Sequence, residues 1–173
     1  VSSQIGPGGL TLNLSQDRFV YDNILGGDPA DPMKWQVPFR VALPYGTASG
    51  DTELVSEPQS SITISEVSSD PDWFKINPDQ TGFFRVNYTA KDWQNLIPAI
   101  ASRSLSATDR LGVQNDAYSL SKAGLLPVTQ FLSLAGAYKS ESDASVWSDL
   151  ASNLKELETL ISDEDFYNHY RMF

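Results

Sequence analysis

The sequence predicts an α+β fold in which strands and helices are segregated along the chain. Between Leu10 and Tyr88 apolar residues often alternate with polar ones and are rich in β-branched and aromatic types, as in strands. After Tyr88 the apolar spacing lengthens to steps of three and four residues, which is typical of helices with one buried side. Because no linker-like or low-complexity segment separates the two parts, we expect two adjoining domains, residues 1–89 and residues 90–173.

Several segments of the first part read as half-buried strands. Apolar and polar residues alternate over residues 10–14, 62–65 and 74–77. Each pattern predicts a strand with one apolar face on a core and one polar face, which includes Lys75, toward solvent. Pro38 cannot donate to a sheet ladder, so it predicts an edge strand or a bulge in the segment 35–43.

Residues 73–88 read as a β-hairpin. The turn would be Asn77–Gly82, in which Pro78 fixes φ and Gly82 supplies the positive φ that closes the turn. Residues 26–32, which carry two glycines and two prolines, predict a loop.

Three segments of the second part carry a helix-start signature, a hydroxyl residue followed three positions later by aspartate. They begin at Thr89, Ser106 and Ser162. The hydroxyl can accept a hydrogen bond from the third amide, and the carboxylate lies near the positive end of the helix. Gly124 predicts the end of the second of these helices, and Pro127 the first turn of the next one.

The segment after Asp143 predicts a helix with one continuous apolar stripe. Its members recur at steps of three and four residues: Trp147, Leu150, Leu154, Leu157 and Ile161. Such a stripe requires a neighbouring helix, and together these segments predict antiparallel helical hairpins.

Composition limits the partners of the chain. Its 173 residues carry a formal net charge of −10, which repels nucleic acid and anionic membranes. We therefore expect neither as a partner. The absence of cysteine excludes disulfides and thiolate zinc sites.

The titratable residues give no catalytic constellation, and we assign no catalytic, cofactor-binding or metal-binding residue. His169 is the one histidine, and we interpret it as a surface or packing residue near a helix end. Asp109 and Asp116 would lie about 10.5 Å apart along one helix, too far for a shared acid–base site. We interpret Asp109 as a first-turn helix carboxylate and Asp116 as a polar anchor to an adjoining loop or helix.

Other polar features also favour structural roles. Asp28 and Asp31 match no calcium-loop spacing and predict a solvated turn. Arg85, placed on a predicted strand, would pair across the sheet or face a part of the protein outside this chain. Aromatic residues at this density form cores more often than carbohydrate platforms. They are Trp35, Trp73, Phe83 and Trp93.

Two motifs carry a resemblance to a known family. Residues 73–88 read WFKINPDQTGFFRVNY and residues 109–120 read DRLGVQNDAYSL. Both resemble the region that follows the catalytic domain in gluzincin-type zinc aminopeptidases. Residues 146–150 (VWSDL) and the pair Phe166–Tyr167 make the puromycin-sensitive branch the most similar one.

This resemblance implies a fold and a role. The first domain would be an antiparallel β-sandwich, and the second would be the first helices of an α-superhelix that encloses the active-site cavity. The chain would then be a non-catalytic segment bridging that helical domain and a catalytic domain outside this sequence. The zinc expected in the parent enzyme would lie in that catalytic domain, because a gluzincin needs His-Glu-x-x-His and this chain has one histidine.

The resemblance also bears on location and partners. The puromycin-sensitive branch implies a cytoplasmic protein, although a secretory location stays open. In a secretory parent the sequons at Asn13 and Asn87 would matter, and a glycan on Asn87 would interfere with packing. Partners would be the other domains of the parent, with peptide substrates met only indirectly and with self-association through an exposed helix face. An independent protein-interaction module, with a sandwich and a helical appendage, is the alternative.

Overall fold

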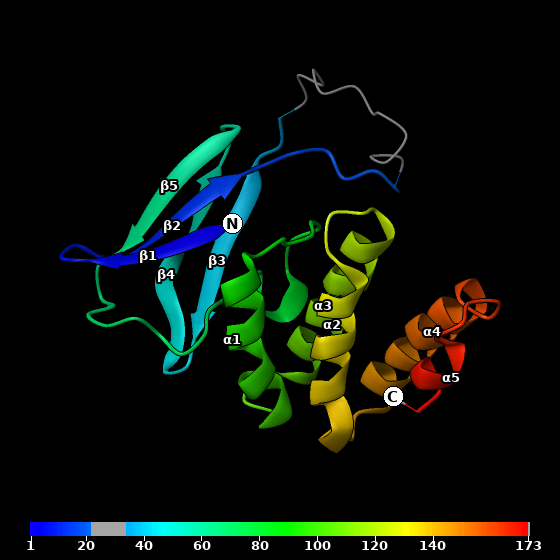
Figure 1. Ribbon diagram of the computed structural model, residues 1–173. Coiled ribbons are helices and arrows are strands. Elements are labelled where there is room, and N and C mark those ends of the chain that lie inside the picture. Colours follow the sequence, from blue (N-terminus) through cyan, green and yellow to red (C-terminus); the bar gives the residue numbers. More distant parts are fainter. Residues whose placement is uncertain (22–33, 173) are drawn as a thin grey trace.

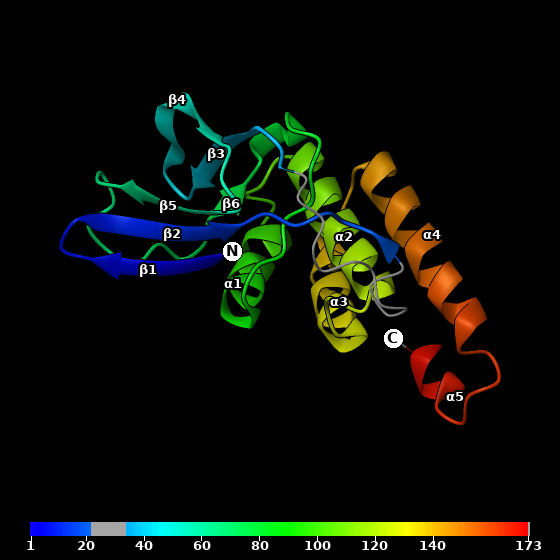
Figure 2. The same cartoon turned by 90° about the horizontal axis from the view of Figure 1, so that it is seen from above.

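The computed structural model describes residues 1–21 and 34–172, and its two classes of structure occupy opposite ends of the molecule (Figure 1). The strands lie at one end, and the last two helices lie at the other in both views (Figures 1 and 2). The predicted order of strands first and helices second is therefore confirmed. The predicted loop at residues 26–32, with Asp28 and Asp31, lies outside the described residues.

The described strands form two three-stranded antiparallel sheets, ordered β1-β2-β5 and β4-β3-β6. Their bounds are β1 Ser2–Gly6, β2 Gly9–Ser15, β3 Val37–Leu43, β4 Gly46–Val55, β5 Gln59–Ile64 and β6 Lys75–Ile76.

The alternation predicted at residues 10–14 and 62–65 is confirmed in β2 and β5. Leu10 and Leu12 are buried, and their pairing partners Ile64 and Ile62 are buried as well. Apolar side chains from adjacent strands thus share one face of the first sheet, as the period of two requires.

Pro38 lies beside a bulge, as expected. The register of β3 against β4 shifts between Phe39 and Val41, and β6 pairs only with Val41 and Ala42. At Pro38, β3 therefore pairs with β4 alone. The missing amide hydrogen of Pro38 thus interrupts no hydrogen bonds between β3 and β6.

The predicted hairpin at residues 73–88 is wrong. β6 ends at Ile76, and a 3-10 turn, η2 (Pro78–Gln80), follows. The positive φ values fall on Asn77, Asp79 and Gln80, whereas Gly82 has none. The returning segment does not pair with β6 as a strand, because Arg85 and Val86 bond to side chains of a helix, as described below.

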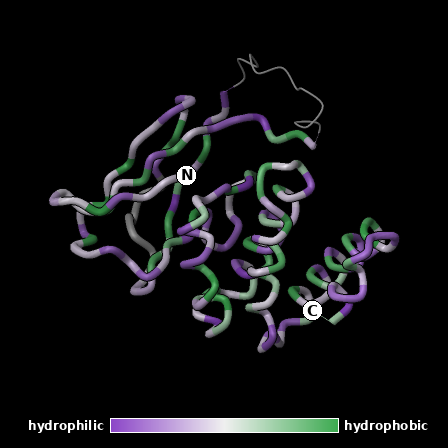
Figure 3. The backbone as a smooth tube through the Cα atoms, in the orientation of Figure 1, coloured by the Kyte–Doolittle hydropathy of each residue, from purple (hydrophilic) through white to green (hydrophobic). Residues whose placement is uncertain are grey.

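The helices are α1 Ala90–Ala101, α2 Ala107–Lys122, α3 Val128–Ala135, η3 Gly136–Ser140, α4 Ala144–Leu160 and α5 Tyr167–Tyr170. In Figure 3 hydrophobic and hydrophilic stretches alternate along the helices. Helix α2 differs from the prediction of one buried side, because residues around most of its circumference are buried. Helix α2 packs against α3 and α4, while α1 packs against α3 and η3. None of the described helices combines the length and apolar composition that a membrane span requires.

Two of the three predicted helix starts are confirmed. The hydroxyls of Thr89 and Ser106 accept hydrogen bonds from the amides of Asp92 and Asp109 at 3.2 and 3.1 Å. The third start is wrong. The Ser162 hydroxyl instead donates to the Thr159 carbonyl, one of the last carbonyls of α4.

The predicted end of α2 is confirmed. Gly124 has a φ of 70°, and its amide donates to the Ser121 carbonyl. The amide of Leu125 donates to the Leu120 carbonyl, which completes a Schellman motif. Pro127 caps α3, one position before the predicted first turn.

The buried side of α4 includes only part of the predicted apolar stripe. The buried residues of the helix are Val146, Leu150, Asn153 and Leu157. Trp147 is 41% exposed, because its indole nitrogen donates to the Glu141 carbonyl at 2.8 Å and holds the ring at the surface. Leu154 and Ile161 are half-buried.

Candidate functional site

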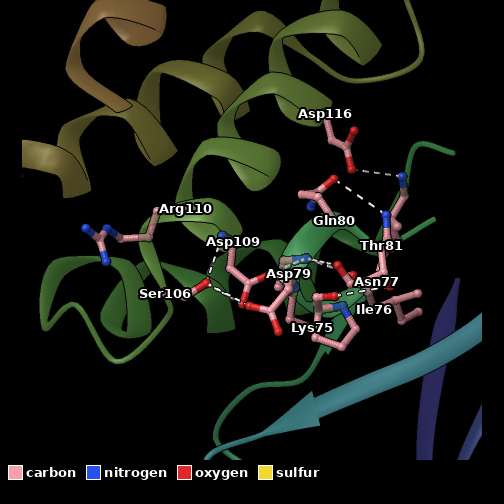
Figure 4. A network of polar contacts seen from close by, with 12 residues as sticks. Lys75, Ile76, Asn77, Asp79, Gln80, Thr81, Ser106, Asp109, Arg110 and Asp116 are labelled. Atoms are coloured by element: carbon pink, nitrogen blue, oxygen red, sulfur yellow. Dashed lines mark hydrogen bonds and ion pairs between the residues drawn. The ribbon is translucent and has the colours of Figure 1, made fainter. Parts of the chain in front are cut away.

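A buried polar network joins the second sheet to α2, and it is the most distinctive site in the part of the chain that the structure describes (Figure 4). At its centre Lys75 of β6, only 1% exposed, forms an ion pair with Asp109 at 3.0 Å. Lys75 also donates to the carbonyls of Ile76 and Asn77 at 3.0 and 2.6 Å. The prediction that Lys75 faces solvent is therefore wrong.

The helix cap places Asp109 for this role. Ser106 begins α2, so Asp109 falls in the first turn, as predicted, with its carboxylate toward the η2 turn. There it accepts hydrogen bonds from the Asp79 amide at 2.8 Å and from the Ser106 hydroxyl at 3.0 Å. Burial lowers the pKa of Lys75, while the charge of Asp109 opposes that shift.

Asn77 holds the η2 turn, which follows β6 in the chain and packs against α2. Its side chain accepts from the Gly82 amide at 2.7 Å and donates to the Gly82 carbonyl at 2.8 Å. The side chain of Gln80 lies where a Cβ on Gly112 of α2 would be, so the absence of that atom lets the turn approach the helix closely.

Gly82→Val should destabilise the chain by about 1 to 3 kcal/mol through overpacking. A Cβ at this position would collide with the Phe84 ring and lie 3.2 Å from the Asn77 carboxamide oxygen. Gly8→Val is the matched control, because nothing lies within 4 Å of a Cβ there. Urea unfolding should show the loss for Gly82→Val alone, and equal midpoints for the two variants would contradict this account.

Asp116, two turns further along α2, holds the returning segment, as the polar anchor predicted for it. Its carboxylate accepts from the Val86 amide at 3.1 Å and from Arg85 at 3.3 Å. Arg85 also donates to the Asn115 side chain at 2.7 Å and lies over the Phe19 ring. It therefore pairs with a helix, not across a sheet. Burial raises the pKa of Asp116 to about 6 and outweighs these donors.

The raised pKa predicts a pH dependence that Asp116→Asn removes. Between 3.8 and about 6 the folded protein keeps a proton that the unfolded chain has released. The contribution of this carboxyl to stability is therefore full below the lower value and is lost as pH rises through about 6. The difference in unfolding free energy between wild type and variant should fall by about 1 kcal/mol per pH unit across this window. A difference that stays constant with pH would contradict the prediction.

A second buried ion pair lies at the other side of α2. Arg110 and Glu141 have side chains that are 7% and 1% exposed, and Arg110 Nη2 donates to Glu141 Oε1 at 2.7 Å. Glu141 also accepts from the amides of Ser142 and Asp143, both at 2.8 Å. The hydrogen bonds from Arg110 hold the pKa of Glu141 low, at about 2. The pair thereby fixes the segment between η3 and α4 against α2.

These contacts are of the kind that fixes a structure. Asp109 and Asp116 serve different partners, and no group of three or more histidine, aspartate or glutamate side chains among the described residues could hold a metal. His169 lies exposed on the short helix α5. Zinc therefore does not fit the described residues, and no catalytic step is assigned to them.

The aromatic residues divide into two groups. Trp73 and Trp93 are 9% and 0% exposed and belong to the core, as predicted. The core prediction is wrong for Trp35, which is 37% exposed, and for Phe83, which is fully exposed.

The asparagines of the two sequons, Asn13 and Asn87, are both exposed.

Sequence comparison relates the chain to a family and to named enzymes. Residues 73–173 match the family described as ERAP1-like C-terminal domain. The chain is 33% identical over 149 residues to puromycin-sensitive aminopeptidase of Caenorhabditis elegans, covering 84% of this chain and 15% of that protein. It is 30% identical over 158 residues to glutamyl aminopeptidase of Mus musculus, covering 88% of this chain and 16% of that protein. The chain thus spans about a sixth or less of the length of these relatives.

Proposed function

The chain belongs to the family of ERAP1-like C-terminal domains, and on that premise we propose that it is a non-catalytic segment of a zinc-dependent aminopeptidase. The observation that carries the proposal is the pairing of this family match with relatives that are aminopeptidases and of which the chain spans 15% and 16%. The parent enzyme would remove amino-terminal residues from peptides. Its zinc and catalytic residues would lie outside this chain.

We propose that residues 1–89 form a β-sandwich domain and residues 90–173 the start of a helical superdomain built of antiparallel hairpins. The presence of two antiparallel sheets within residues 1–89 supports the first assignment. The second is supported by the helices that follow Thr89. The family match begins at residue 73 and therefore covers the Lys75 segment as well as the helices.

The role of the segment would be to bridge the catalytic domain and the helical domain. Such a bridge must hold its two parts in a fixed orientation. The ion pair between Lys75 and Asp109 and the contacts of Asp116 support this role, because they tie β6 and the segment after it to α2. The direct partners would be the other domains of the parent, and peptides would be met only indirectly.

The outer side of the last helices supports continuation of the helical domain. Leu160 and Phe166 are 69% and 53% exposed, and Trp147 is 41% exposed. An independent module would hide apolar side chains of this size, whereas a helical superdomain would cover them with its next helices. In the isolated chain this side would favour self-association.

We propose a cytoplasmic location for the parent, in keeping with the resemblance to the puromycin-sensitive branch. A protein that entered the secretory pathway would expose the sequons at Asn13 and Asn87 to glycosylation. Glycan analysis of the natural protein distinguishes the two locations.

Co-expression of this chain with the remainder of its parent tests the proposal. A segment of one enzyme should assemble with that remainder into a complex of one copy each, which size-exclusion chromatography with light scattering would detect. If the two pieces stay separate while each is folded, the chain is an independent module and the proposal is wrong.

A further inference from the structure

Phe83 is the most exposed large apolar side chain among the described residues. Its ring is fully exposed, whereas the next values, 78% and 69%, belong to Met172 and Leu160 near the end of the chain. Scattered apolar residues on a surface need no explanation. Phe83 differs from them because of the backbone that carries it.

The backbone is anchored on both sides of Phe83. On one side, the amide and carbonyl of Gly82 both bond to the Asn77 side chain, at 2.7 and 2.8 Å. On the other side, the Val86 amide donates to Asp116 at 3.1 Å, and Arg85 bonds to Asn115 at 2.7 Å. The chain therefore fixes the backbone from which this ring projects, while none of its described residues covers the ring.

The turn that leads to Phe83 is conformationally costly. Asn77, Asp79 and Gln80 have φ values of 60°, 57° and 54°, in the left-handed region that non-glycine residues rarely adopt. Such conformations persist only where the surroundings enforce them, and they cluster at binding and switch sites. The buried pair of Lys75 and Asp109 supplies that enforcement here.

The geometry of the amino terminus indicates which partner is nearest. The nitrogen of Val1 lies 2.7 Å from the Asn87 carbonyl, in the same segment between η2 and α1 as Phe83 and four residues from it. In the parent proposed above, the polypeptide that precedes Val1 would enter beside this segment. The relatives have about five sixths of their length outside the matched region, so ample chain exists to cover the ring.

We propose that Phe83 is the anchor residue of an interdomain contact, and that its ring inserts into an apolar pocket on the part of the same parent polypeptide that precedes this chain. The proposal rests on the proposed function, since it requires such a parent. Because the backbone that carries this aromatic ring is already ordered, docking requires little further ordering of the turn, and aromatic residues are common at interface hot spots. The network around Lys75 then has a role beyond stability, because it presents Phe83 to that pocket.

Phe83→Ala should act in the intact parent and not in the isolated chain. In the isolated chain none of the described residues covers the ring, so thermal unfolding of the variant should match wild type. In the intact parent, hydrogen exchange of the amides in residues 77–86 should become faster by at least about tenfold, because the contact that protects the turn is lost. Phe83→Leu, which keeps an apolar side chain, should show a smaller increase.

Tyr45→Ala is the matched control. Tyr45 is 67% exposed, lies at the turn between β3 and β4, and is not part of the proposed contact. Its replacement should leave exchange in residues 77–86 unchanged in both the chain and the parent.

The outcomes separate this inference from the function on which it rests. Unchanged exchange in the Phe83→Ala parent, with aminopeptidase activity intact, would overturn the inference and leave the proposed function standing. A parent without aminopeptidase activity would overturn the function itself. A wild-type chain that dimerises alone and becomes monomeric on Phe83→Ala would also overturn the inference, because the ring would then contact a second copy of this chain.

Discussion

Replacing Asp109 with alanine should destabilise the chain by about 3 to 5 kcal/mol, because it leaves the Lys75 ammonium buried without its counter-charge. Lys75 is 1% exposed and would keep only the carbonyls of Ile76 and Asn77 as partners. The Asp79 amide would also lose its acceptor. Since domains are stable by only about 5 to 15 kcal/mol, this loss would bring the variant close to unfolding. Urea unfolding of wild type and variant at neutral pH measures this difference in unfolding free energy.

A control variant and a pH dependence make this prediction specific to the buried pair. Asp70→Ala breaks the exposed pair of Asp70 and Lys91, whose side chains are 50% and 65% exposed, and should leave the free energy of unfolding almost unchanged. The Asp109→Ala variant should also regain stability relative to wild type as pH rises toward 10.5, because a buried lysine with a lowered pKa loses its charge before the unfolded chain does. A loss below about 1 kcal/mol for Asp109→Ala would mean that water reaches Lys75.

Glu141→Gln should destabilise the chain by about 1.5 to 3 kcal/mol, the range for hydrogen bonds to charged groups. The carboxylate faces the Arg110 guanidinium with both oxygens, and a carboxamide would direct an NH2 group at one of these donors. Thermal unfolding should show the loss. Glu57→Gln is the matched control, since the pair of Glu57 and Lys34 has side chains that are 67% and 52% exposed.

The effect of Glu141→Gln should depend on pH in the opposite sense to that of Asp116→Asn. The pKa of Glu141 is lowered from 4.5 to about 2, so its contribution to stability is full above 4.5 and is lost as pH falls through about 2. The difference between wild type and the Gln variant should therefore shrink across that window. A difference that persists at the acidic end would contradict the assignment of the lowered pKa to this pair.

Local signals predicted the helix boundaries where the partners lie within one turn. Thr89 and Ser106 bond to amides three residues away, and Gly124 ends α2 through contacts within five residues. Ser162 carries the same signature but bonds backward to Thr159. A hydroxyl that follows one helix and precedes another has two possible partners, and sequence spacing does not choose between them.

Contacts between distant residues could not be predicted in this way. Lys75 alternates with apolar residues as a solvent-facing residue would, yet its partner Asp109 lies in another element. The partner of Arg110 is likewise 31 residues away. The hairpin prediction failed for the same reason, because Arg85 and Val86 find their hydrogen-bond partners on α2.

Composition also could not place individual aromatic residues. Trp93 is in the core and Phe83 is fully exposed, although both were predicted to be core residues. Asn77 and Asp116 set the position of Phe83 by fixing the backbone on either side of it. The one signal in the sequence is the preceding Gly82, which by itself predicts a hairpin turn.

The most direct test of the central claim measures zinc content and aminopeptidase activity on the same sample of the purified chain. The sample would be assayed against a panel of aminoacyl fluorogenic substrates, with and without a chelator. We expect no bound zinc and no turnover, because the catalytic residues would lie in the rest of the parent. One equivalent of zinc together with chelator-sensitive turnover would contradict the claim and would place a catalytic site within these 173 residues.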